Sequence, residues 1–589
     1  MVFHIQNLSL LVLLLISKNN FKMKNKYKII LVVLLGLQFQ SCVNDSQLEV
    51  EEYNVLSAEN LDPEKLVVAA YSAIDFRYNT GQFRDLWPFD HAPSNWATSD
   101  LRAGDAYKGG GGTGDNPGGG MLQLETHDIF ASSENVYNLW RSIYFGIKRV
   151  DTALRVVSAK SEQEFPARTT RIGELKVLRA HFYFEAFKNF GSFVWYDENT
   201  PIAEINKISN TFDTTFMWSK IEADLNDAIS KLPETQQDLG RVNKMVAYAF
   251  LCKAQVFQKK WVNAIESADK VIASGKYQLV SDLEKLYSIP GYGDRENIFA
   301  IQFSIKDGSQ YGNLNFGNLL NAPDSPGDDA NNPYLNGDDF HKPSQSLVNS
   351  YKVGQNGLPL FDTFNNSNVT PTDAVDPRLD HTVGRPGITW KDWSIRQQQL
   401  DWSRDPATYG YFLNKKNVIS PKSSGLASNP TGFPWALGNL DFPIIKYSDL
   451  LLWKAEALIE SGNAASGIAI INQIRTRAKN SPYVKDFVSP TQNAANYSIG
   501  MYSTALSQAE AIKALRMERR LELANEGHAF YDLVRWGIAE QYVNNYLQTE
   551  KNRRTYLTSA VLQSHELYLP IPQIEIDASA GVLKQRAGY

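Results

Sequence analysis

The stretch Ser448-Asp-Leu-Leu-Leu-Trp-Lys-Ala-Glu-Ala-Leu-Ile-Glu460 is followed by the joint Ser461-Gly462-Asn463 and by a second apolar-periodic run, Ala464–Ala478. Apolar residues that recur every three or four positions predict amphipathic helices, and Gly or Asn between two such runs predicts a short connection. Ala455 and Gly467 lie twelve residues apart across this connection. Small residues at this offset allow two antiparallel helices to approach closely, so the stretch predicts a tetratricopeptide-like helical hairpin.

A second predicted hairpin lies earlier in the chain. It pairs Val242–Gln258 with Trp261–Ala273, and Cys252 and Ala264 are again twelve residues apart. The same periodicity predicts further helices over Pro63–Phe76, Val136–Val157, Arg171–Phe190, Thr215–Leu232, Gln508 to about Ala524, and Ala529 to about Ala539. The alternative to a stacked array of hairpins is a set of ordinary helical pairs that form no solenoid.

Two long segments between the predicted helices lack this periodicity. Asn79–His127 and Gly308–Pro443 are rich in Gly, Pro, Asn and Asp, and contain only short runs typical of strands. Loops of this length are usually functional or disordered, and the many large aromatic residues here argue against disorder. The predicted fold class is therefore mainly α: a tetratricopeptide-like scaffold with long, loop-rich, irregular ligand-binding elaborations and a few short strands.

The composition excludes several classes of function. The 589 residues carry a formal net charge of −5, which argues against a nucleic-acid binder, since such proteins have basic surfaces. Two cysteines exclude a disulfide scaffold and a cysteine-based zinc cluster. The chain has no His-Glu-x-x-His or Gly-x-Ser-x-Gly motif, so hydrolase signatures are unsupported. A glycosidase carboxylate pair stays open, because 64 acidic residues always offer some pair.

Two further motifs have residue types that occur in ligand sites. The glycine run Gly109–Gly120 is not followed by Gly-Lys-Ser/Thr, so we interpret it as a flexible surface loop and not as a phosphate cradle. An acidic group consists of Asp328, Asp329, Asp338 and Asp339. It lacks the alternating ligand order and the sixth-position glycine of a calcium-binding EF-hand loop. The sequence therefore predicts no metal and no cofactor.

Tryptophans in the two long segments have the chemistry of a sugar-binding site. The flat apolar face of a sugar packs on an aromatic ring, while Asp, Asn and Arg form hydrogen bonds with its hydroxyl groups. The candidate residues are Trp87, Asn95, Trp96, Asp100, Trp390, Trp393, Trp402 and Arg404. The alternative for any one of these rings is a structural role, in which it packs in the core and holds its loop in place.

The first forty residues have the pattern of an export signal. The apolar run Ile29–Leu37 follows a lysine-rich stretch and is far shorter than the roughly 20 residues that span a bilayer. Cys42 stands where cleavage is expected, which resembles a bacterial lipoprotein whose new N-terminal cysteine is acylated; the alternative is an ordinary signal peptide. Met23 is the expected true start. Removal of residues 1–41 takes away five lysines and leaves a net charge of −10.

Five stretches resemble motifs of the SusD/RagB family. They are Leu178–Phe184, Asp376–Leu379, Asp441–Ala457, Glu518–Trp536 and Leu569–Glu575. The resemblance covers essentially residues 42–589, with an N-terminal part over 42–235 and a C-terminal part over 236–589. Within Glu518–Trp536, Arg519 with Glu522 and Asp532 with Arg535 are expected ion pairs. We interpret this stretch as a network that pins the fold and not as a catalytic site.

The resemblance implies a function as well as a fold. It implies a surface-exposed, lipid-anchored outer-membrane protein that binds oligosaccharides or polysaccharides without cleaving them. It also implies delivery of the glycan to a SusC-like TonB-dependent β-barrel transporter. The binding residues vary strongly within the family, so only Trp96 and its neighbours lie in a region carried over from it. The alternatives are a glycoside hydrolase, and a peptide binder or a scaffold of the transporter.

Overall fold

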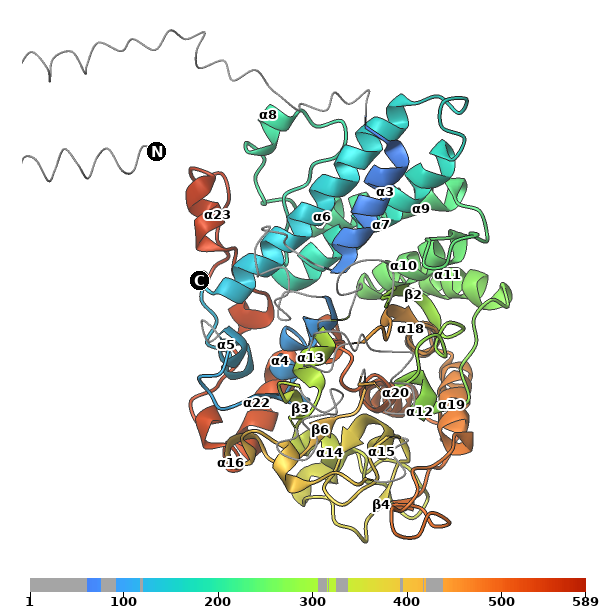
Figure 1. Ribbon diagram of the computed structural model, residues 1–589, viewed down its shortest axis with the longest axis vertical. Coiled ribbons are helices and arrows are strands. Elements are labelled where there is room, and N and C mark those ends of the chain that lie inside the picture. Colours follow the sequence, from blue (N-terminus) through green and yellow to red (C-terminus); the bar gives the residue numbers. More distant parts are fainter. Residues whose placement is uncertain are drawn as a thin grey trace, which may run out of the picture. The chain divides into compact units, whose positions relative to one another are not determined.

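Helices form most of the regular structure in the computed structural model of the chain (Figure 1). The structure describes residues 61–75, 92–116, 120–305, 315, 317–324, 337–391, 396–416, 418–419 and 438–589. The longer helices are α3 (Pro63–Ser72), α6 (Glu134–Ala159), α7 (Arg168–Phe190), α9 (Thr214–Lys231), α10 (Lys244–Phe257), α11 (Trp261–Ala273), α18 (Tyr447–Glu460), α19 (Ala464–Asn480), α20 (Gln508–Glu522) and α22 (Ala539–Glu550). Residues 62–589 belong to one compact unit.

Shorter elements lie between these helices. The short helices are α4 (Asp100–Ala103), α5 (Gly120–Thr126), α8 (Ile202–Ile205), α12 (Leu283–Leu286), α13 (Gly317–Asn321), α14 (Gln345–Ser350), α15 (Arg378–Thr382), α16 (Pro406–Tyr409), α21 (Ala529–Arg535) and α23 (Gln573–Ala578). The strands are β1 (Ala106–Gly109), β2 (Asn297–Ile301), β3 (Phe340–Pro343), β4 (Ala374–Val375), β5 (Val383–Gly384), β6 (Leu413–Asn414), β7 (Phe442–Lys446) and β8 (Asn496–Tyr497).

The two predicted hairpins are present and they stack on each other. α10 packs against α11, and α18 packs against α19. α11 also packs against α18, so the hairpins are neighbours although a long segment separates them in the sequence (Figure 1). The array continues from α10 through α9 and α7 to α6. The predicted tetratricopeptide-like helical scaffold is therefore confirmed.

Small residues allow the two helices of the second hairpin, α18 and α19, to approach closely, as the spacing predicts. A Cβ atom on Gly467 would overlap the side chain of Ile459 and come within 2.7 Å of the carbonyl oxygen of Ala455. Only glycine fits at this position without a shift of the neighbouring helix. In the first hairpin, Cys252 and Ala264 are fully buried.

Side-chain caps mark where helices begin. The side chain of Asn463 accepts a hydrogen bond from the backbone N–H of Ser466 at the start of α19. Ser507 and Glu510 form a reciprocal capping box at the start of α20. These side chains satisfy backbone donors that have no partner within the helix, which fixes the first turn.

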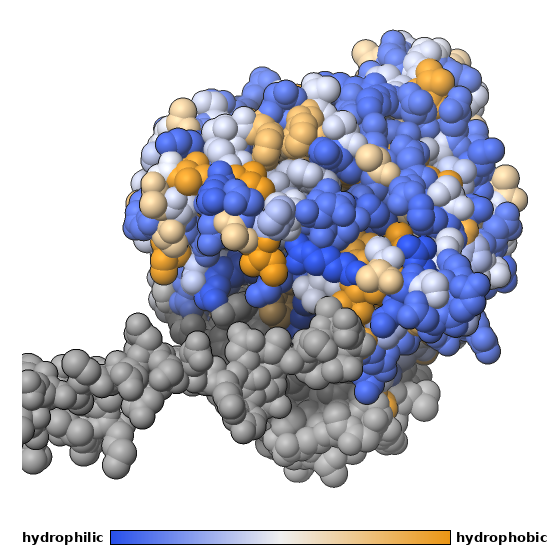
Figure 2. All heavy atoms as spheres, turned by 90° about the horizontal axis from the view of Figure 1, so that it is seen from above, coloured by the Kyte–Doolittle hydropathy of each residue, from blue (hydrophilic) through white to orange (hydrophobic). Residues whose placement is uncertain are grey.

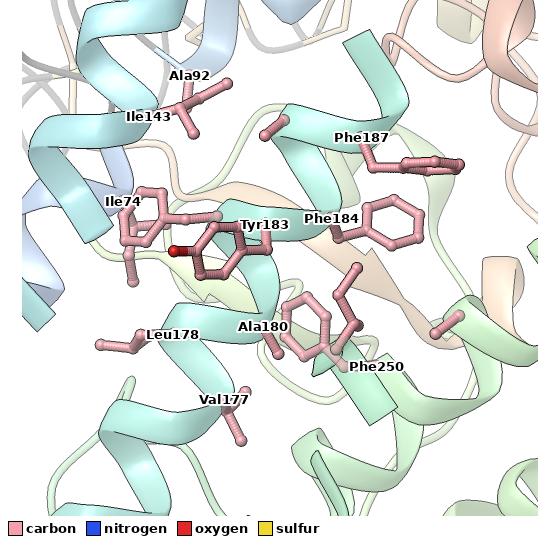
Figure 3. Close-up of a cluster of buried hydrophobic side chains, with 14 of the residues drawn as sticks. Ile74, Ala92, Ile143, Val177, Leu178, Ala180, Tyr183, Phe184, Phe187 and Phe250 are labelled. Atoms are coloured by element: carbon pink, nitrogen blue, oxygen red, sulfur yellow. The ribbon is translucent and has the colours of Figure 1, made fainter. Parts of the chain in front are cut away.

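Aromatic side chains of α7 fill the largest part of the core. Figure 3 shows Tyr183 and Phe184 between Ile143 of α6 and Phe250 of α10. Phe182 and Phe190 of the same helix are also fully buried. Because α7 is buried on nearly every side over its second half, it forms the centre around which α6, α9 and α10 pack.

Short strands occur in both long segments, as the sequence predicts: β1 lies in the first, and β3, β4, β5 and β6 lie in the second, whereas β2 and β8 lie outside them and β7 starts at the end of the second. β1 pairs with β3, β2 with β7 and β5 with β6 in antiparallel two-stranded sheets, and β4 pairs with β8 in a parallel one. Tyr107 of β1 lies opposite Lys342 of β3. This β1–β3 sheet joins the two loop-rich segments to each other and forms the platform for the candidate site.

Buried ion pairs pin α20 to distant parts of the chain. Glu518 accepts hydrogen bonds from Arg378 at 2.6 Å and from Arg475 at 3.0 Å, and all three side chains are almost completely buried. Arg519 pairs with Asp449 of α18 and with Asp532 of α21, at 2.7 Å in each case. Burial disfavours each charge alone, so these groups depend on one another.

Of the two ion pairs expected within this stretch, one is present. Asp532 and Arg535 are 2.8 Å apart. The expected pair of Arg519 with Glu522 is wrong, because Glu522 points to Arg378 and Arg477 instead. The predicted helix from Ala529 ends at Arg535, four residues early, and α22 was not predicted.

The face in Figure 2 is mostly hydrophilic, with its apolar residues in small separate groups. Among the described residues, we find no helix long and apolar enough to cross a bilayer. Cys42 and the expected export signal lie outside the described residues.

Candidate functional site

The structure places Trp96 in the core. Its side chain is 1% exposed, and its ring lies parallel to the ring of His341 with centroids 4.5 Å apart. Trp96 belongs to the 3₁₀ helix Ala92–Ala97, whereas His341 belongs to β3. With one face covered by an imidazole and almost no exposed surface, the indole has no face to offer a sugar. The expectation of a stacking role is therefore corrected to a packing role.

Asn95 and Asp100 hold this segment to the Glu518–Trp536 stretch. One carboxylate oxygen of Asp100 accepts the backbone N–H of Gly527 at 3.1 Å and lies 3.0 Å from Nε2 of His341. The Asn95 amide donates to the carbonyl oxygen of Glu526 at 3.5 Å. Gly527 has φ of +77°, and a Cβ there would overlap the Asn95 side chain. Asp100 is 1% exposed, so it is a structural acceptor and not a sugar ligand.

Trp390 and Trp402 are also buried. They are 1% and 2% exposed, and their rings meet edge to face with centroids 5.5 Å apart. A Cβ on Gly384 would overlap the Trp390 ring, so β5 lies directly against it. Their expected role as sugar platforms is corrected in the same way, because neither ring reaches the surface. Trp87 and Trp393 lie outside the described residues.

Arg404 is the candidate whose charged end reaches the surface. Its guanidinium lies 3.1 Å from Asp115, 3.7 Å from Asp324 and 3.9 Å from Asp338. These four side chains are 30–39% exposed, and we call them the Arg404 corner. Its backbone N–H donates to the buried Asp339 carboxylate at 2.8 Å, which fixes the start of the Arg404 side chain.

The charges in the Arg404 corner do not balance. Three carboxylates surround one guanidinium, and partial burial raises the pKa of Asp338 to about 6, with Asp115 and Asp324 adding to the rise and Arg404 opposing it. Burial also raises the pKa of Asp324. At neutral pH the corner therefore presents an excess of carboxylate acceptors beside one bidentate donor, the combination that sugar hydroxyl groups need.

The glycine run forms one wall of the Arg404 corner. The buried ammonium of Lys108 donates to the carbonyl oxygens of Gly109 at 3.0 Å, Gly112 at 2.8 Å and Asp115 at 2.5 Å. Burial lowers the pKa of Lys108 to about 8. Residues 109–116 are thus a tied turn and not the flexible loop expected. Since their carbonyl groups point at an internal cation, the turn is not a phosphate cradle.

The acidic group of Asp328, Asp329, Asp338 and Asp339 divides in two. Asp339 pairs with Lys342 at 2.7 Å, and Asp338 faces Arg404, so a protein cation already opposes each carboxylate. Asp328 and Asp329 lie outside the described residues. Within the part of the chain that the structure describes, we find no cluster of three or more His, Cys, Asp or Glu that could hold a metal ion.

The sequence alone missed Asp115 and Asp324 as members of a site. Asp115 lies within the glycine run, where Asp is an ordinary turn residue, and Asp324 has no distinguishing neighbour in the sequence. The one available signal was a carboxylate in each loop-rich segment close to a Gly or Pro turn, which is too common to select a residue.

The fold and the Arg404 corner define a helical-repeat protein whose long loops carry a polar surface site. The chain belongs to the SusD family, whose model matches residues 295–589. A second family model, described as "Starch-binding associating with outer membrane", matches residues 48–255.

Curated relatives are similar over most of the chain. SusD-like protein P38 of Formosa agariphila is 23% identical over 533 residues, which cover 86% of this chain and 90% of that protein. SusD-like protein P25 of the same organism is 22% identical over 486 residues, which cover 78% and 80%.

Solved structures share the fold. A laminarin-binding SusD-like protein superposes with a TM-score of 0.64 at 23% identity, over 90% of this chain and 99% of that one. Surface glycan-binding protein A from Bacteroides thetaiotaomicron, in complex with laminarihexaose, superposes with a TM-score of 0.62 at 19% identity, over 89% and 98%.

Proposed function

We propose that this protein is a cell-surface glycan-binding lipoprotein that captures oligosaccharides or polysaccharides and passes them to a TonB-dependent transporter in the outer membrane. The observation that carries the proposal is membership of the SusD family, with matches in both the N-terminal and the C-terminal part. Two proteins with the same fold are named for binding laminarin or were solved with laminarihexaose. Neutral glucans are therefore the first ligands to test.

The Arg404 corner is the proposed polar part of the glycan site. Arg404 donates to sugar oxygens, while Asp115, Asp324 and Asp338 accept from hydroxyl groups. Because all four side chains are about a third exposed, a sugar can reach them and complete their hydrogen bonding at little desolvation cost. Trp87 and Trp393 stay the proposed aromatic platforms.

The buried tryptophans have a supporting role in this proposal. Trp402 is two residues before Arg404 and is buried against Trp390, so the core holds the backbone next to Arg404 in place. A site whose supporting residues are locked by packing binds with a small ordering cost. Capture of this kind needs no chemical step, which is why we propose a binding protein and not a hydrolase.

Attachment to the membrane is proposed to occur through lipid at Cys42. A single acyl chain binds membranes only marginally, so stable anchoring requires several chains on this residue. The proposed partner is a SusC-like β-barrel. Replacement of Cys42 by Ser is expected to release the protein from the membrane fraction, and retention of that variant in the membrane would contradict the lipid anchor.

The experiment that tests the function is isothermal titration of the purified protein against a panel of neutral oligosaccharides, laminarin fragments included. We expect binding that the variant Arg404→Ala weakens and that the control Arg295→Ala, at an exposed arginine outside the corner, leaves unchanged. Chromatography of the glycans after incubation separates binding from hydrolysis. Failure to bind any glycan, with co-purification of the transporter intact, would favour the scaffold alternative.

A further inference from the structure

A groove of about 380 Å³ runs along α20, away from the Arg404 corner. One wall is α20 itself, and the opposite walls come from the α21–α22 region and from the segment 361–364. Aromatic side chains from these walls enter it: Phe361, Phe364, Trp536 and Tyr542, all partly exposed. We call this cavity the α20 groove. Its volume suits a ligand of one or two rings.

Three cations of α20 stand over these aromatic rings. Lys513, Arg516 and Arg520 occupy positions i, i+3 and i+7, so they form one stripe on the helix. Lys513 lies 5.4 Å from the centroid of Phe361, Arg516 lies 5.2 Å from Trp536, and Arg520 lies 5.3 Å from Phe364. The groove is therefore lined by paired cations and rings.

Two of these cations are already neutralised. Lys513 pairs with Asp362 at 2.6 Å, and Arg520 pairs with Asp105 at 2.7 Å. Arg516 differs: it makes no hydrogen bond and no ion pair with any residue that the structure describes, and its Nε atom is buried without a partner.

The neighbouring carboxylates do not supply the missing partner. Glu456 and Glu460 both attract Arg516 through their charges, but neither forms an ion pair with it. Both oxygens of Glu456 are used by Arg535 and by the indole N–H of Trp536. Burial is the largest influence on Arg516, and it lowers the pKa of the guanidinium. No described residue therefore accepts from the terminal N–H groups of Arg516, and these groups, unlike the enclosed Nε, can be reached by a ligand in the groove.

We propose that the α20 groove is a second ligand site, which binds a carboxylated sugar, a uronic acid residue, through its carboxylate on Arg516. The Arg516 guanidinium presents a planar set of donors that matches a carboxylate in a bidentate arrangement. The apolar face of the sugar ring then lies against the partly exposed aromatic side chains. The carboxylate follows from Arg516 alone, while the choice of a sugar as its carrier rests on the proposed function.

The test is isothermal titration with two disaccharides that differ in one group. One contains glucuronic acid and glucose, and the other contains two glucose units in the same linkage. We expect the acidic disaccharide to bind, and Arg516→Met to weaken it about 10- to 100-fold, as loss of a charged hydrogen bond does. Arg516→Lys should retain part of the affinity, and Arg295→Met is the matched control.

The outcomes separate this site from the Arg404 corner. Arg516→Met should weaken binding of the acidic disaccharide in the Arg404→Ala background as well as in the wild type, and an Arg516-dependent acidic sugar site would stand even if no neutral glycan binds. No binding of the acidic disaccharide, or equal binding by Arg516→Met, would overturn the groove proposal. If acetate binds as tightly as the disaccharide, the sugar ring adds no affinity, and the claim that the ligand is a sugar would be contradicted. Since Arg516 makes no hydrogen bond and no ion pair with a described residue, and Met keeps an apolar side chain against the Trp536 ring, the variant should fold, which its thermal transition will show.

Discussion

The indole of Trp96 lies flat on the imidazole of His341, with the ring planes 5° apart. His341 is held in turn by Asp100 on one ring nitrogen, at 3.0 Å, and by Asn414 on the other, at 2.9 Å. All four side chains are almost completely buried. This stack joins the first loop-rich segment to β3 and β6, so Trp96 stabilises the platform beneath the Arg404 corner.

Replacement of Trp96 by Ala should therefore destabilise the protein and spare its ligand contacts. Loss of a buried Trp leaves a cavity and costs about 3–5 kcal/mol. We expect the urea unfolding midpoint to fall, while the glycan dissociation constant of the folded variant changes less than twofold. A large loss of glycan affinity with unchanged stability would instead show that Trp96 contacts the ligand.

Gly467→Ala should destabilise the hairpin of α18 and α19. In an exposed helix this change stabilises by roughly 1 kcal/mol, because Ala has the higher helix propensity. At Gly467 the new Cβ overlaps Ile459 and approaches the Ala455 carbonyl, so we expect the opposite sign. The change in unfolding free energy is the measurement. A stabilised variant would show that the helices do not meet at this residue.

Removal of Arg378 should cost more than removal of a surface charge. Arg378→Met removes one of the two buried guanidiniums that Asp376 and Glu518 share and leaves Arg475 alone to face both carboxylates; loss of a buried ionic partner typically costs about 3–5 kcal/mol. The control Lys207→Met breaks an exposed pair with Glu204 and should cost less than about 1 kcal/mol. Equal effects of the two substitutions would contradict a pinning role for the network.

Buried histidines should make the protein sensitive to mild acid. Burial lowers the pKa of His181 to about 4 and of His127 to about 3, and it also lowers the pKa of His341 and His528. These side chains stay neutral in the folded state below pH 6.5, where the unfolded chain binds protons. The histidine contribution to the free energy of unfolding should therefore fall as the pH drops from 6.5 towards 4. Comparison with the variant His181→Gln isolates this contribution from carboxyls such as Glu125 and Asp338, whose raised pKa acts in the opposite direction.

Buried glutamates should add a second loss at lower pH. Neighbouring cations outweigh the effect of burial and lower the pKa of Glu522 and Glu526 to about 2. In the unfolded chain the same side chains have ordinary pKa values near 4.5. As the pH falls, the unfolded chain therefore gains these protons while the folded protein still holds both side chains ionised. Their contribution is present above pH 4.5 and is lost as the pH falls towards 2. Urea unfolding of the wild type and of His181→Gln, measured at half-unit steps from pH 7.5 to 2.5, checks both parts. Equal pH dependence of the two proteins between pH 6.5 and 4 would contradict the histidine effect.

Periodicity predicted the helical scaffold well because helix formation follows local pattern. The hairpin of α18 and α19 begins and ends within two residues of the prediction, since its apolar stripe, its small residues and its cap at Asn463 agree. α22 was missed because polar residues dominate it. Its buried Ala539, Val543 and Leu547 recur every four positions, but too sparsely to stand out beside Gln, Asn and Glu.

The site was predicted less well because burial depends on partners far away in the sequence. Nothing near Trp96 in the sequence indicates that His341 covers its face. Likewise, Arg404 was a candidate from its local neighbours, whereas Asp115 and Asp324 reach it only through the β1–β3 platform. Residue type and loop composition therefore indicated the region of the site, and long-range packing decided which side chains reach its surface.

The most direct test of the central claim is calorimetric titration of the purified wild-type protein and of Arg404→Ala with neutral oligosaccharides. We predict that wild type binds at least one of them and releases it uncleaved. We also predict that Arg404→Ala binds it about tenfold or more weakly, while the Arg295→Ala control matches wild type. Cleavage of the glycan, or the absence of binding to every glycan by a folded protein, would contradict the account.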